Sequence, residues 1–562
     1  MCITLWALLV LFCNCARANV LEIFPGQSIT EAVQMVSQGD TVLLTPGEYR
    51  EFVRVREFGV TICSNFLFSG DTSDIRSTVI IADTLDIDSA SCLFIYLPNE
   101  QDSVVLVGLS FANGRGTRWI SDEVVSSAGG GVFAYRSRVR VSHCLFSECS
   151  AGAGGGMAVI HEEPDVGGVF GVLRDCIFWN CQSAGPQGGG GMYALSIPII
   201  LERTVFEACS SMSIGGYFSF GAQTAMTACT LRNCGSIIGA AQIGSIDESV
   251  VSECVFDSNG IPGQGGFRGA CHLRTGGDVR VRHNIFRNNT TSDIALTMFD
   301  FDRFGVPFLE GNVFESHTMG PRSGAFYFWD CEGDISYNVF RNCSSEYGAS
   351  LVPGGRGIVR IHHNIFAGNS QGQNGFGSVI NYINAGSIPA RCDSNIFEGN
   401  VGPVISYDEN SPHPQSIFAQ SNWWGDSSGP YHPTRNPNGQ GDTLLSDIIV
   451  FDPWLTVRPD TSQSISVPDN DNLASLSTWE LLPIYPNPFN NRFTVSIAGF
   501  TREDFEISMF DLLGRKVSDL YKGRLSTQSF MVSVPESLGS GVYFILAKDK
   551  LQTCSKKVLF LK

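Results

Sequence analysis

Short apolar runs recur at a nearly constant spacing between residues 131 and 400. In each of ten rounds, a small residue opens a brief apolar run, as in Gly131-Val-Phe-Ala, and a triplet such as Cys144-Leu-Phe146 follows. Cys or Asn stands three residues after the last residue of the triplet in nine of the ten rounds. The triplets that end at Phe146 to Phe397 give a period of about 28 residues, which indicates stacked supersecondary units.

The composition of these runs predicts strands rather than helices. They are short and rich in Val, Ile, Phe and Tyr, and the gaps between them are rich in Gly and Asn, which suit left-handed turns. One such unit cannot bury its own apolar side chains, whereas stacked copies can. We therefore expect a solenoid of parallel strands whose Phe residues form a continuous internal stack. The Asn residues are expected to form a ladder of side-chain amides, one rung about every 4.8 Å.

The repeats also resemble a known family. Phe256-Asp-Ser-Asn259 and Phe366-Ala-Gly-Asn369 are similar to the right-handed parallel β-helix repeats of the pectin-lyase-like superfamily and to repeats of polymorphic outer-membrane adhesins. The resemblance covers residues 20 to about 457. It implies an all-β fold, a right-handed parallel β-helix solenoid, but it does not define an activity because this fold supports many functions.

The first residues predict export followed by a cap. Residues 1–18 are apolar and end in Ala16-Arg17-Ala18, as in a secretory signal peptide cleaved after Ala18. Ser28-Ile-Thr-Glu31 is a capping box, so we expect an amphipathic helix that includes Val36 and ends at Gly39. Such a helix would cover the end of the stack in a β-helix domain of residues 19–457. No later apolar run is long enough to span a bilayer.

The last part of the chain has a different composition. Trp423, Trp424 and Trp454 are expected to close the far end of the solenoid, with a sugar-binding aromatic patch as the alternative. Residues 458–480 read as a polar linker. Residues 481–562 contain short alternating strands, which predicts a small Ig-like β-sandwich.

This last segment carries a second resemblance. Tyr485-Pro-Asn-Pro-Phe489 and Leu538-Gly-Ser-Gly-Val-Tyr-Phe544 resemble motifs of the type A C-terminal sorting domain of the type IX secretion system. The resemblance implies export in two steps, with the type IX machinery as a partner. The protein would then be secreted or held at the outer-membrane surface of a Gram-negative bacterium.

Charge argues against one class of partner, and the positions of the cysteines predict their redox state. The net charge of −18 argues against a nucleic-acid partner, which would need a basic face. All seven lysines lie from Lys516 onward, so the predicted solenoid uses only arginine for positive charge. Most of the 18 cysteines fall at repeat positions, where stacked Cβ atoms would be further apart than the roughly 3.8 Å typical of a disulfide. We expect free, stacked thiols, with a disulfide framework as the alternative.

A candidate site emerges when the rungs are aligned on the small residue that opens each apolar run. Asp300 then stacks on Asp330 and Phe299 on Trp329, and Arg274 lies one rung earlier. Two stacked carboxylates repel unless a proton or a cation such as Ca²⁺ lies between them. The alternative is ordinary solvated surface. The candidates are catalytic Arg274, Asp300 and Asp330; metal-binding Asp300, Asp302 and Asp330; and substrate-binding Phe299, Trp329 and Tyr382, which the alignment places two rungs after Trp329.

Two functional hypotheses follow from the sequence. In the first, the solenoid is a non-catalytic adhesin or glycan binder at the cell surface, with an extracellular polysaccharide as a partner. In the second, it is a polysaccharide lyase or glycoside hydrolase that acts on an extended acidic polysaccharide. His362 and His363 precede Asn364 at repeat positions and are expected to have a structural role.

Overall fold

A computed structural model provides the fold, and its parts are described separately because the chain divides into two compact units, residues 1–465 and 466–562. The structure describes residues 19–460 except 83–88, 100, 122–123, 163–170, 222, 237–238, 246–248, 261–269, 276–278, 292–295, 300–306, 320–323, 330–332, 346–349, 355–358, 372–378, 383–389 and 408–415. It also describes residues 480–560 except 482–483, 485–488, 491, 499–503, 511–514, 525–528, 534–537 and 549–552. The predicted signal peptide lies outside the described residues.

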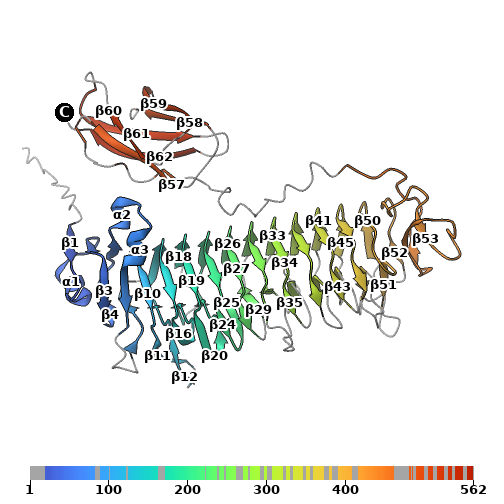
Figure 1. The fold of residues 1–562 in the computed structure, drawn as a ribbon, viewed down its shortest axis with the longest axis horizontal. Coiled ribbons are helices and arrows are strands. Elements are labelled where there is room, and N and C mark those ends of the chain that lie inside the picture. Colours follow the sequence, from blue (N-terminus) through green and yellow to red (C-terminus); the bar gives the residue numbers. More distant parts are fainter. Residues whose placement is uncertain are drawn as a thin grey trace, which may run out of the picture. The chain divides into compact units, whose positions relative to one another are not determined.

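The first unit is a parallel β-helix built on three long sheets, which we name A, B and C (Figure 1). Sheet A consists of β1 (Val20–Ile23), β2 (Thr41–Leu44), β5 (Thr61–Ser64), β9 (Ser103–Val107), β14 (Arg138–Ser142), β18 (Gly171–Arg174), β22 (Ile199–Glu202), β26 (Thr224–Thr227), β30 (Ser249–Ser252), β33 (Val279–Arg282), β37 (Pro307–Glu310), β41 (Gly333–Ser336), β45 (Val359–His362), β49 (Ala390–Asp393), β52 (Ile417–Phe418) and β55 (Ile449–Val450). Sheet B consists of β3 (Gly47–Arg50), β6 (Thr78–Ile81), β10 (Ser110–Ala112), β15 (Leu145–Ser147), β19 (Ile177–Trp179), β23 (Val205–Glu207), β27 (Thr230–Arg232), β31 (Val255–Asp257), β34 (Ile285–Arg287), β38 (Val313–Glu315), β42 (Val339–Arg341), β46 (Ile365–Ala367) and β50 (Ile396–Glu398).

Sheet C and three smaller sheets complete this unit. Sheet C consists of β4 (Val53–Val55), β8 (Leu93–Ile95), β13 (Val132–Tyr135), β17 (Met157–Ile160), β21 (Met192–Leu195), β25 (Ile214–Phe220), β29 (Gly239–Ser245), β32 (Cys271–Thr275), β36 (Leu296–Phe299), β40 (Phe326–Trp329), β44 (Leu351–Gly354), β48 (Ile380–Tyr382) and β51 (Ile405–Tyr407). Sheet D consists of β7 (Ser89–Ala90), β11 (Gly116–Ser121), β12 (Val124–Ala128), β16 (Ser150–Ala153), β20 (Gln182–Gly188), β24 (Ser210–Ser211) and β28 (Gly235–Ser236). Sheet E consists of β35 (Thr290–Thr291), β39 (Thr318–Met319), β43 (Ser344–Ser345) and β47 (Ser370–Gln371), and the last pair is β53 (Pro430–Tyr431) with β54 (Gly441–Thr443).

The predicted aromatic stack forms the centre of this β-helix. All ten triplets lie in register on successive strands of sheet B, from Phe146 to Phe397. Neighbouring rings stack with centroids 4.4 to 5.2 Å apart, and the stack is interrupted only where Leu231 replaces Phe. Because each ring is fully buried, burial of each contributes roughly 1.5–3 kcal/mol to stability. The predicted parallel β-helix is confirmed.

Ladders of asparagine side chains line the corners beside sheet B. In the longer ladder, each side-chain Oδ1 accepts a hydrogen bond from the backbone N–H of the asparagine one rung before it, at 2.7 to 2.9 Å, from Asn284 to Asn422. A shorter ladder runs from Asn369 through Asn400 to Asp442. These amides satisfy backbone groups that the corners would otherwise leave buried and unpaired, so the predicted amide ladder is confirmed.

Cysteines take the same corner positions in the N-terminal half. The structure describes the side chains of thirteen cysteines in the β-helix, and all of them are free and buried. Their thiols donate to backbone carbonyls, as Cys176 does to Arg174 at 3.3 Å. Burial raises the pKa of Cys144 to about 12, which keeps its thiol protonated at neutral pH. The structure therefore supports free thiols for these residues.

Both ends of the β-helix are closed. At the N-terminal end, α1 (Ile29–Met35) buries Ile29, Ala32 and Val33, and Glu51 accepts hydrogen bonds from the N–H groups of its first turn at 2.7 and 3.1 Å. Val36 was expected inside this helix, but it is the extended C-cap residue, so the expected length was wrong. The following segment turns instead, because the Asp40 carboxylate accepts the N–H of residue 37 at 2.8 Å. Two further short helices are α2 (Phe66–Ser69) and α3 (Ser73–Ser77).

At the C-terminal end, tryptophan replaces phenylalanine in the internal stack. The Trp424 ring is fully buried and stacks on Phe397, with centroids 4.8 Å apart and an interplanar angle of 12°. Trp423 and Trp454 are half-buried. The structure therefore supports Trp424 as the residue that ends the apolar column.

The second unit consists of antiparallel strands in two sheets. One sheet contains β56 (Glu480–Leu481), β57 (Arg492–Ala498) and β60 (Ser529–Ser533), and the other contains β59 (Lys516–Arg524), β58 (Asp504–Phe510), β61 (Gly541–Lys548) and β62 (Thr553–Phe560). Apolar side chains that include Phe493, Val495 and Ile545 form its own core. The expected all-β C-terminal domain is confirmed.

Candidate functional site

The outer face of sheet C carries apolar side chains that the solenoid core does not use. Successive side chains of each strand point to opposite faces of this sheet. Val132 and Ala134 therefore pack in the main core, while Phe133 belongs to a separate cluster on the other side. Phe133 and Tyr193 are only 2 and 4% exposed, although they face away from the main core. Trp119 of the β11–β12 hairpin belongs to the same cluster, with its ring 6.5 Å from that of Tyr193. The hairpin therefore packs over part of this face.

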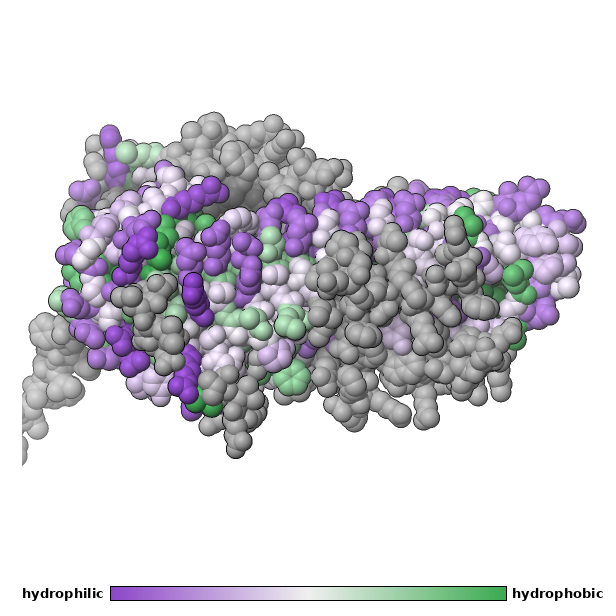
Figure 2. All heavy atoms as spheres, turned by 60° about the horizontal axis from the view of Figure 1, so that its bottom comes forward, coloured by the Kyte–Doolittle hydropathy of each residue, from purple (hydrophilic) through white to green (hydrophobic). Residues whose placement is uncertain are grey.

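A second column on the same face is buried in its middle, where Ile160 is 1% exposed, and accessible at its two ends. Strand pairing aligns five residues on successive rungs, which we call the sheet C stripe: Tyr96, Tyr135, Ile160, Leu195 and Phe220. Its ends are open, since Tyr96 is 39% and Phe220 is 43% exposed. Figure 2 shows hydrophobic residues among hydrophilic ones on the underside of the β-helix of Figure 1, the side where β25 and β29 lie.

Local packing holds the rings at both ends of the stripe. The Tyr96 and Tyr135 rings stack with centroids 6.0 Å apart. At the other end, a Cβ atom on Gly244 would come within 2.7 Å of the Phe220 ring, so this glycine makes room for that ring. The stripe is thus an apolar column with a pre-formed exposed ring at each end, and the sequence contains no repeated signal that would have revealed it.

The strand register extends this column to residues predicted from the sequence. Gly244 pairs with Arg274, Arg274 with Phe299, and Phe299 with Trp329. The predicted alignment of these positions is therefore correct for the backbone, while their side chains lie outside the described residues. Asp300, Asp302 and Asp330 also lie outside the described residues, so the carboxylate and calcium site stays a prediction.

Tyr382 lies elsewhere than the alignment placed it. Leu351 pairs with Ile380, whereas Trp329 pairs with Gly354, so Tyr382 falls one position before the Trp329 column. The small residue that opens the run lies one residue before Phe326 but two residues before Ile380, which caused the error. The Tyr382 side chain is 3% exposed and belongs to the main core, and burial raises its pKa.

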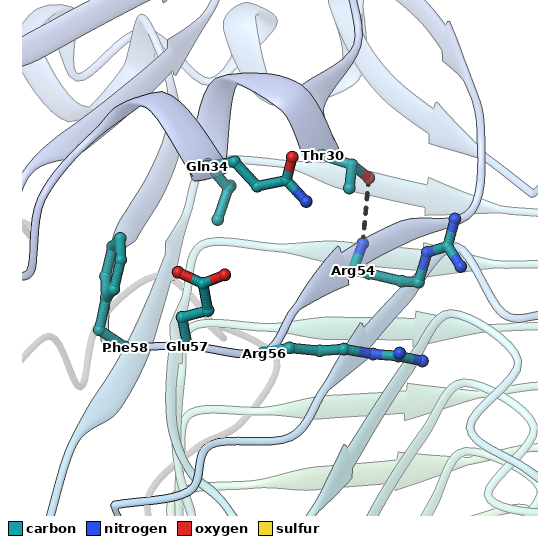
Figure 3. A pocket seen from close by; sticks show the side chains of 7 residues that line it. Thr30, Gln34, Arg54, Arg56, Glu57 and Phe58 are labelled. Atoms are coloured by element: carbon teal, nitrogen blue, oxygen red, sulfur yellow. Dashed lines mark hydrogen bonds between the residues drawn. The ribbon is translucent and has the colours of Figure 1, made fainter.

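A pocket lies where this face meets the capping helix (Figure 3). It has a volume of about 300 Å³. Its lining residues are Thr30, Val33, Gln34, Arg54, Arg56, Glu57 and Phe58. The Arg54 guanidinium lies 5.4 Å from the ring centroid of Phe52, and that of Arg56 lies 5.6 Å from the ring of Phe94. These cation–π contacts orient two positive charges at this end of the β-helix.

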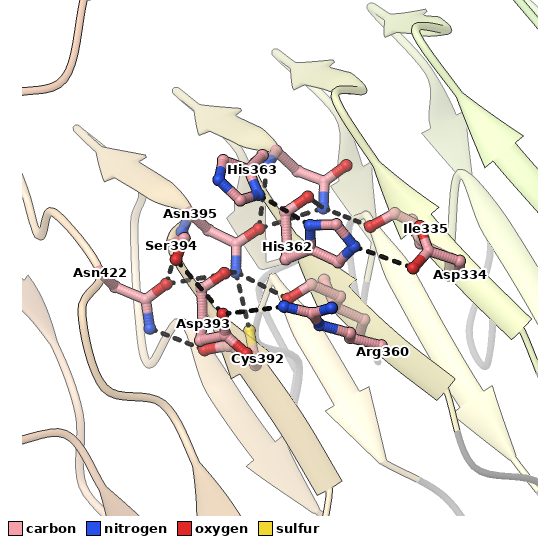
Figure 4. A network of polar contacts seen from close by, with 12 residues as sticks. Asp334, Ile335, Arg360, His362, His363, Cys392, Asp393, Ser394, Asn395 and Asn422 are labelled. Carbon is pink, nitrogen blue, oxygen red and sulfur yellow. Dashed lines mark hydrogen bonds and ion pairs between the residues drawn. The ribbon is translucent and has the colours of Figure 1, made fainter.

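A polar network crosses three rungs on the outer side of sheet A (Figure 4). His362 Nε2 lies 2.9 Å from the Asp334 carboxylate, and its Nδ1 lies 2.7 Å from Nδ1 of His363. The Tyr337 ring stacks on His363 with centroids 5.1 Å apart. Desolvation, and then the neighbouring His362, lower the pKa of His363. Because these contacts join neighbouring rungs, they fit the structural role expected for the two histidines.

No cluster of three or more His, Cys, Asp or Glu side chains that could hold a metal ion occurs among the residues that the structure describes. Within the same part of the chain, no helix is long and apolar enough to cross a membrane.

Comparison with known families locates the export signal. Residues 483–560 match the family of secretion system C-terminal sorting domains. The chain carries a type IX sorting domain. The protein is therefore secreted or displayed at the cell surface, and its sorting domain interacts with the type IX secretion machinery. No curated protein sequence matches the chain.

Proposed function

We propose that this exported protein binds an extended extracellular glycan, without catalysis, along the outer face of sheet C. The sheet C stripe carries this proposal, because strand pairing aligns its apolar side chains on consecutive rungs and leaves an aromatic ring exposed at each end. Four rung spacings separate Tyr96 from Phe220, which gives a stripe of about 19 Å. This length suits several sugar rings of a linear polymer.

The aromatic residues provide the chemistry. Tyr and Phe rings offer flat apolar faces, and a tyrosine adds a hydroxyl that can bond to a polar ligand. The backbone register of Phe299 and Trp329 follows the same column, which supports the proposal that these aromatics extend the binding surface. A rigid β-helix holds all these positions at a fixed spacing without the entropic cost of ordering a loop.

A polysaccharide panel tests the proposal. Biolayer interferometry of the mature chain should detect binding to at least one linear polysaccharide. Phe220→Ala and Tyr96→Ala should each weaken that binding by about threefold to thirtyfold, equivalent to about 0.7–2 kcal/mol. Trp179→Ala is the matched control, because Trp179 is 44% exposed on sheet B. Equal losses in all three variants, or no binding by the wild type, would refute the proposal.

The second candidate function is that of a polysaccharide lyase or hydrolase. The observation that supports it is that Arg274, Phe299 and Trp329 lie in one column on successive rungs. Asp300 and Asp330 directly follow two of these residues in the chain. The test follows unsaturated products and reducing ends on the same panel, with and without calcium. Activity that Asp300→Ala or Asp330→Ala abolishes would establish catalysis and displace the binding proposal.

We also propose that the protein is retained at the outer-membrane surface after export. The type IX sorting domain at residues 483–560 supports this step. Fractionation of cells that express the full chain should then find residues 19–457 in the outer-membrane fraction, accessible to external protease. Recovery of the protein only from the culture medium would contradict retention and leave export intact.

A further inference from the structure

Arg54 and Arg56 are two exposed arginines at the N-terminal end of the β-helix. Among the described residues of this unit, nine arginines form ion pairs with carboxylates: Arg50, Arg174, Arg203, Arg232, Arg282, Arg287, Arg341, Arg360 and Arg458. Arg54 and Arg56 are exposed, and neither forms an ion pair with any residue in the described part of the chain. On a chain with a net charge of −18, the pocket lining carries these two arginines and one carboxylate, that of Glu57.

The geometry presents the two guanidinium groups together. Arg54 lies in β4 and Arg56 directly follows that strand, and both side chains project from the outer face of sheet C. The two residues are two positions apart along the strand, so their Cα atoms are about 7 Å apart. Figure 3 shows their side chains extending in the same direction, while the Glu57 carboxylate points toward Gln34. Each guanidinium lies over a phenylalanine ring, so its orientation is partly set before any ligand binds.

Arg56 directly continues the sheet C stripe, and Arg54 continues the neighbouring column of Phe94 and Phe133. Arg54 pairs with Phe94, and the Tyr96 N–H donates to the carbonyl of Val55 at 2.9 Å, which places Arg56 beside Tyr96. A ligand whose rings lie on the stripe would therefore reach the guanidinium groups one rung further on. Guanidinium groups match the planar oxygen pairs of carboxylates and the oxygens of sulfates.

We propose that Arg54 and Arg56 form an oxyanion subsite that binds a carboxylate or sulfate group on the glycan held by the stripe. This inference rests on the proposed glycan-binding function. It also makes binding of an anionic glycan independent of calcium, because the protein itself supplies the positive charge. The interaction is exposed to solvent, so salt weakens it.

Paired polysaccharides test the subsite on the mature chain in EDTA. Polygalacturonate is compared with its carboxyl-reduced form, and dextran sulfate with dextran. The wild type should prefer the anionic member of a pair at least tenfold. Arg54→Gln/Arg56→Gln should remove that preference and leave binding to the neutral member unchanged. The control Arg287→Gln/Arg341→Gln removes the same charge from ion-paired positions and should keep the preference.

The outcomes separate the two proposals. Glycan binding with no preference for anionic members, or an equal loss in the control variant, overturns the oxyanion subsite and leaves the glycan proposal standing. If the wild type binds no polysaccharide, the glycan proposal fails, and inorganic sulfate tests the subsite alone. Sulfate should then raise the melting temperature of the wild type, relative to chloride at equal ionic strength, more than that of Arg54→Gln/Arg56→Gln. Equal shifts in both proteins overturn the subsite.

Discussion

Replacing Asn338 by alanine is the sharpest test of what holds the β-helix together. Asn338 is fully buried, and its Oδ1 accepts from both the backbone N–H and the side-chain Nδ2 of Asn312, each at 2.9 Å. Its own Nδ2 donates to the Leu309 carbonyl at 2.8 Å. Alanine would leave the Asn312 N–H and the Leu309 carbonyl buried without these partners.

The magnitude follows from these two orphaned groups. Each buried polar group that loses its partner costs about 1–3 kcal/mol, so Asn338→Ala should lower the free energy of unfolding by about 2–6 kcal/mol. The Asn312 side chain keeps its bonds to the carbonyls of Val281 and Glu310, at 2.8 and 3.2 Å, and adds little to this loss.

Cysteine provides a graded comparison at the same position. At an equivalent corner, the Cys254 thiol donates to the Met226 carbonyl at 3.6 Å and accepts from the Cys229 N–H at 3.4 Å. Asn338→Cys should therefore keep weaker versions of the same bonds and lose about half as much stability as Asn338→Ala. Asn438→Ala, at an exposed turn residue, is the control and should stay within about 0.5 kcal/mol of the wild type.

Two measurements check this prediction. Denaturant unfolding of the mature chain reports the free energy, and hydrogen exchange of the peptide that contains Asn312 reports the local effect. The local measurement matters because each rung of a solenoid contacts mainly its neighbours. Retained protection of the Asn312 amide in Asn338→Ala, or equal destabilisation by alanine and cysteine, would refute the hydrogen-bond explanation.

Three further predictions concern the core and the C-terminal cap. Burial raises the pKa of Asp442 to about 6 from 3.8, so the native state holds a proton that the unfolded state has released, and stability should fall as the pH rises from about 4 to 7. Asp442→Asn keeps a hydrogen-bond acceptor for Asn400 and should remove this loss of stability with rising pH. In denaturant unfolding at pH 7, the free energy of unfolding should rise by about 1–3 kcal/mol. An unchanged pH profile would contradict this prediction. Phe286→Ala should cost about 3–5 kcal/mol in the same assay, but Phe286→Leu much less, because Leu231 already fills this column; equal costs would exclude the stack as the cause. The thirteen buried cysteines of the β-helix should resist N-ethylmaleimide in the native protein and react after denaturation, as measured by mass spectrometry; rapid native labelling would contradict their burial.

The periodic part of the fold was predictable because it repeats. Each rung repeats the same local pattern, so the triplets ending at Phe146 and Phe397 indicated parallel stacking and an internal ring column before any coordinates were known. The Asn ladder followed for the same reason, since equivalent residues of stacked strands must lie one above another. The sorting domain was recognisable because its motifs occur in order within a short segment.

Positions that depend on irregular segments were harder to predict. Aligning rungs on a small residue placed Arg274, Phe299 and Trp329 correctly but moved Tyr382 by one position. One residue matters in a strand, because successive side chains point to opposite faces. The shift moved Tyr382 from the outer column, where it was expected, to the core.

Sequence was sufficient for the stacked β-helix, its internal columns and its export domain, because all three depend on spacing between residues near one another in the chain. The accessible surface depended on contacts between distant segments. The β11–β12 hairpin covers Tyr193 through Trp119, while Phe220 stays open above Gly244. Arg54 and Arg56 lie on the same face because β4 pairs with β8 in sheet C, and they line a pocket with residues of the capping helix. No periodicity encodes such contacts, because side-chain packing between unlike segments decides them.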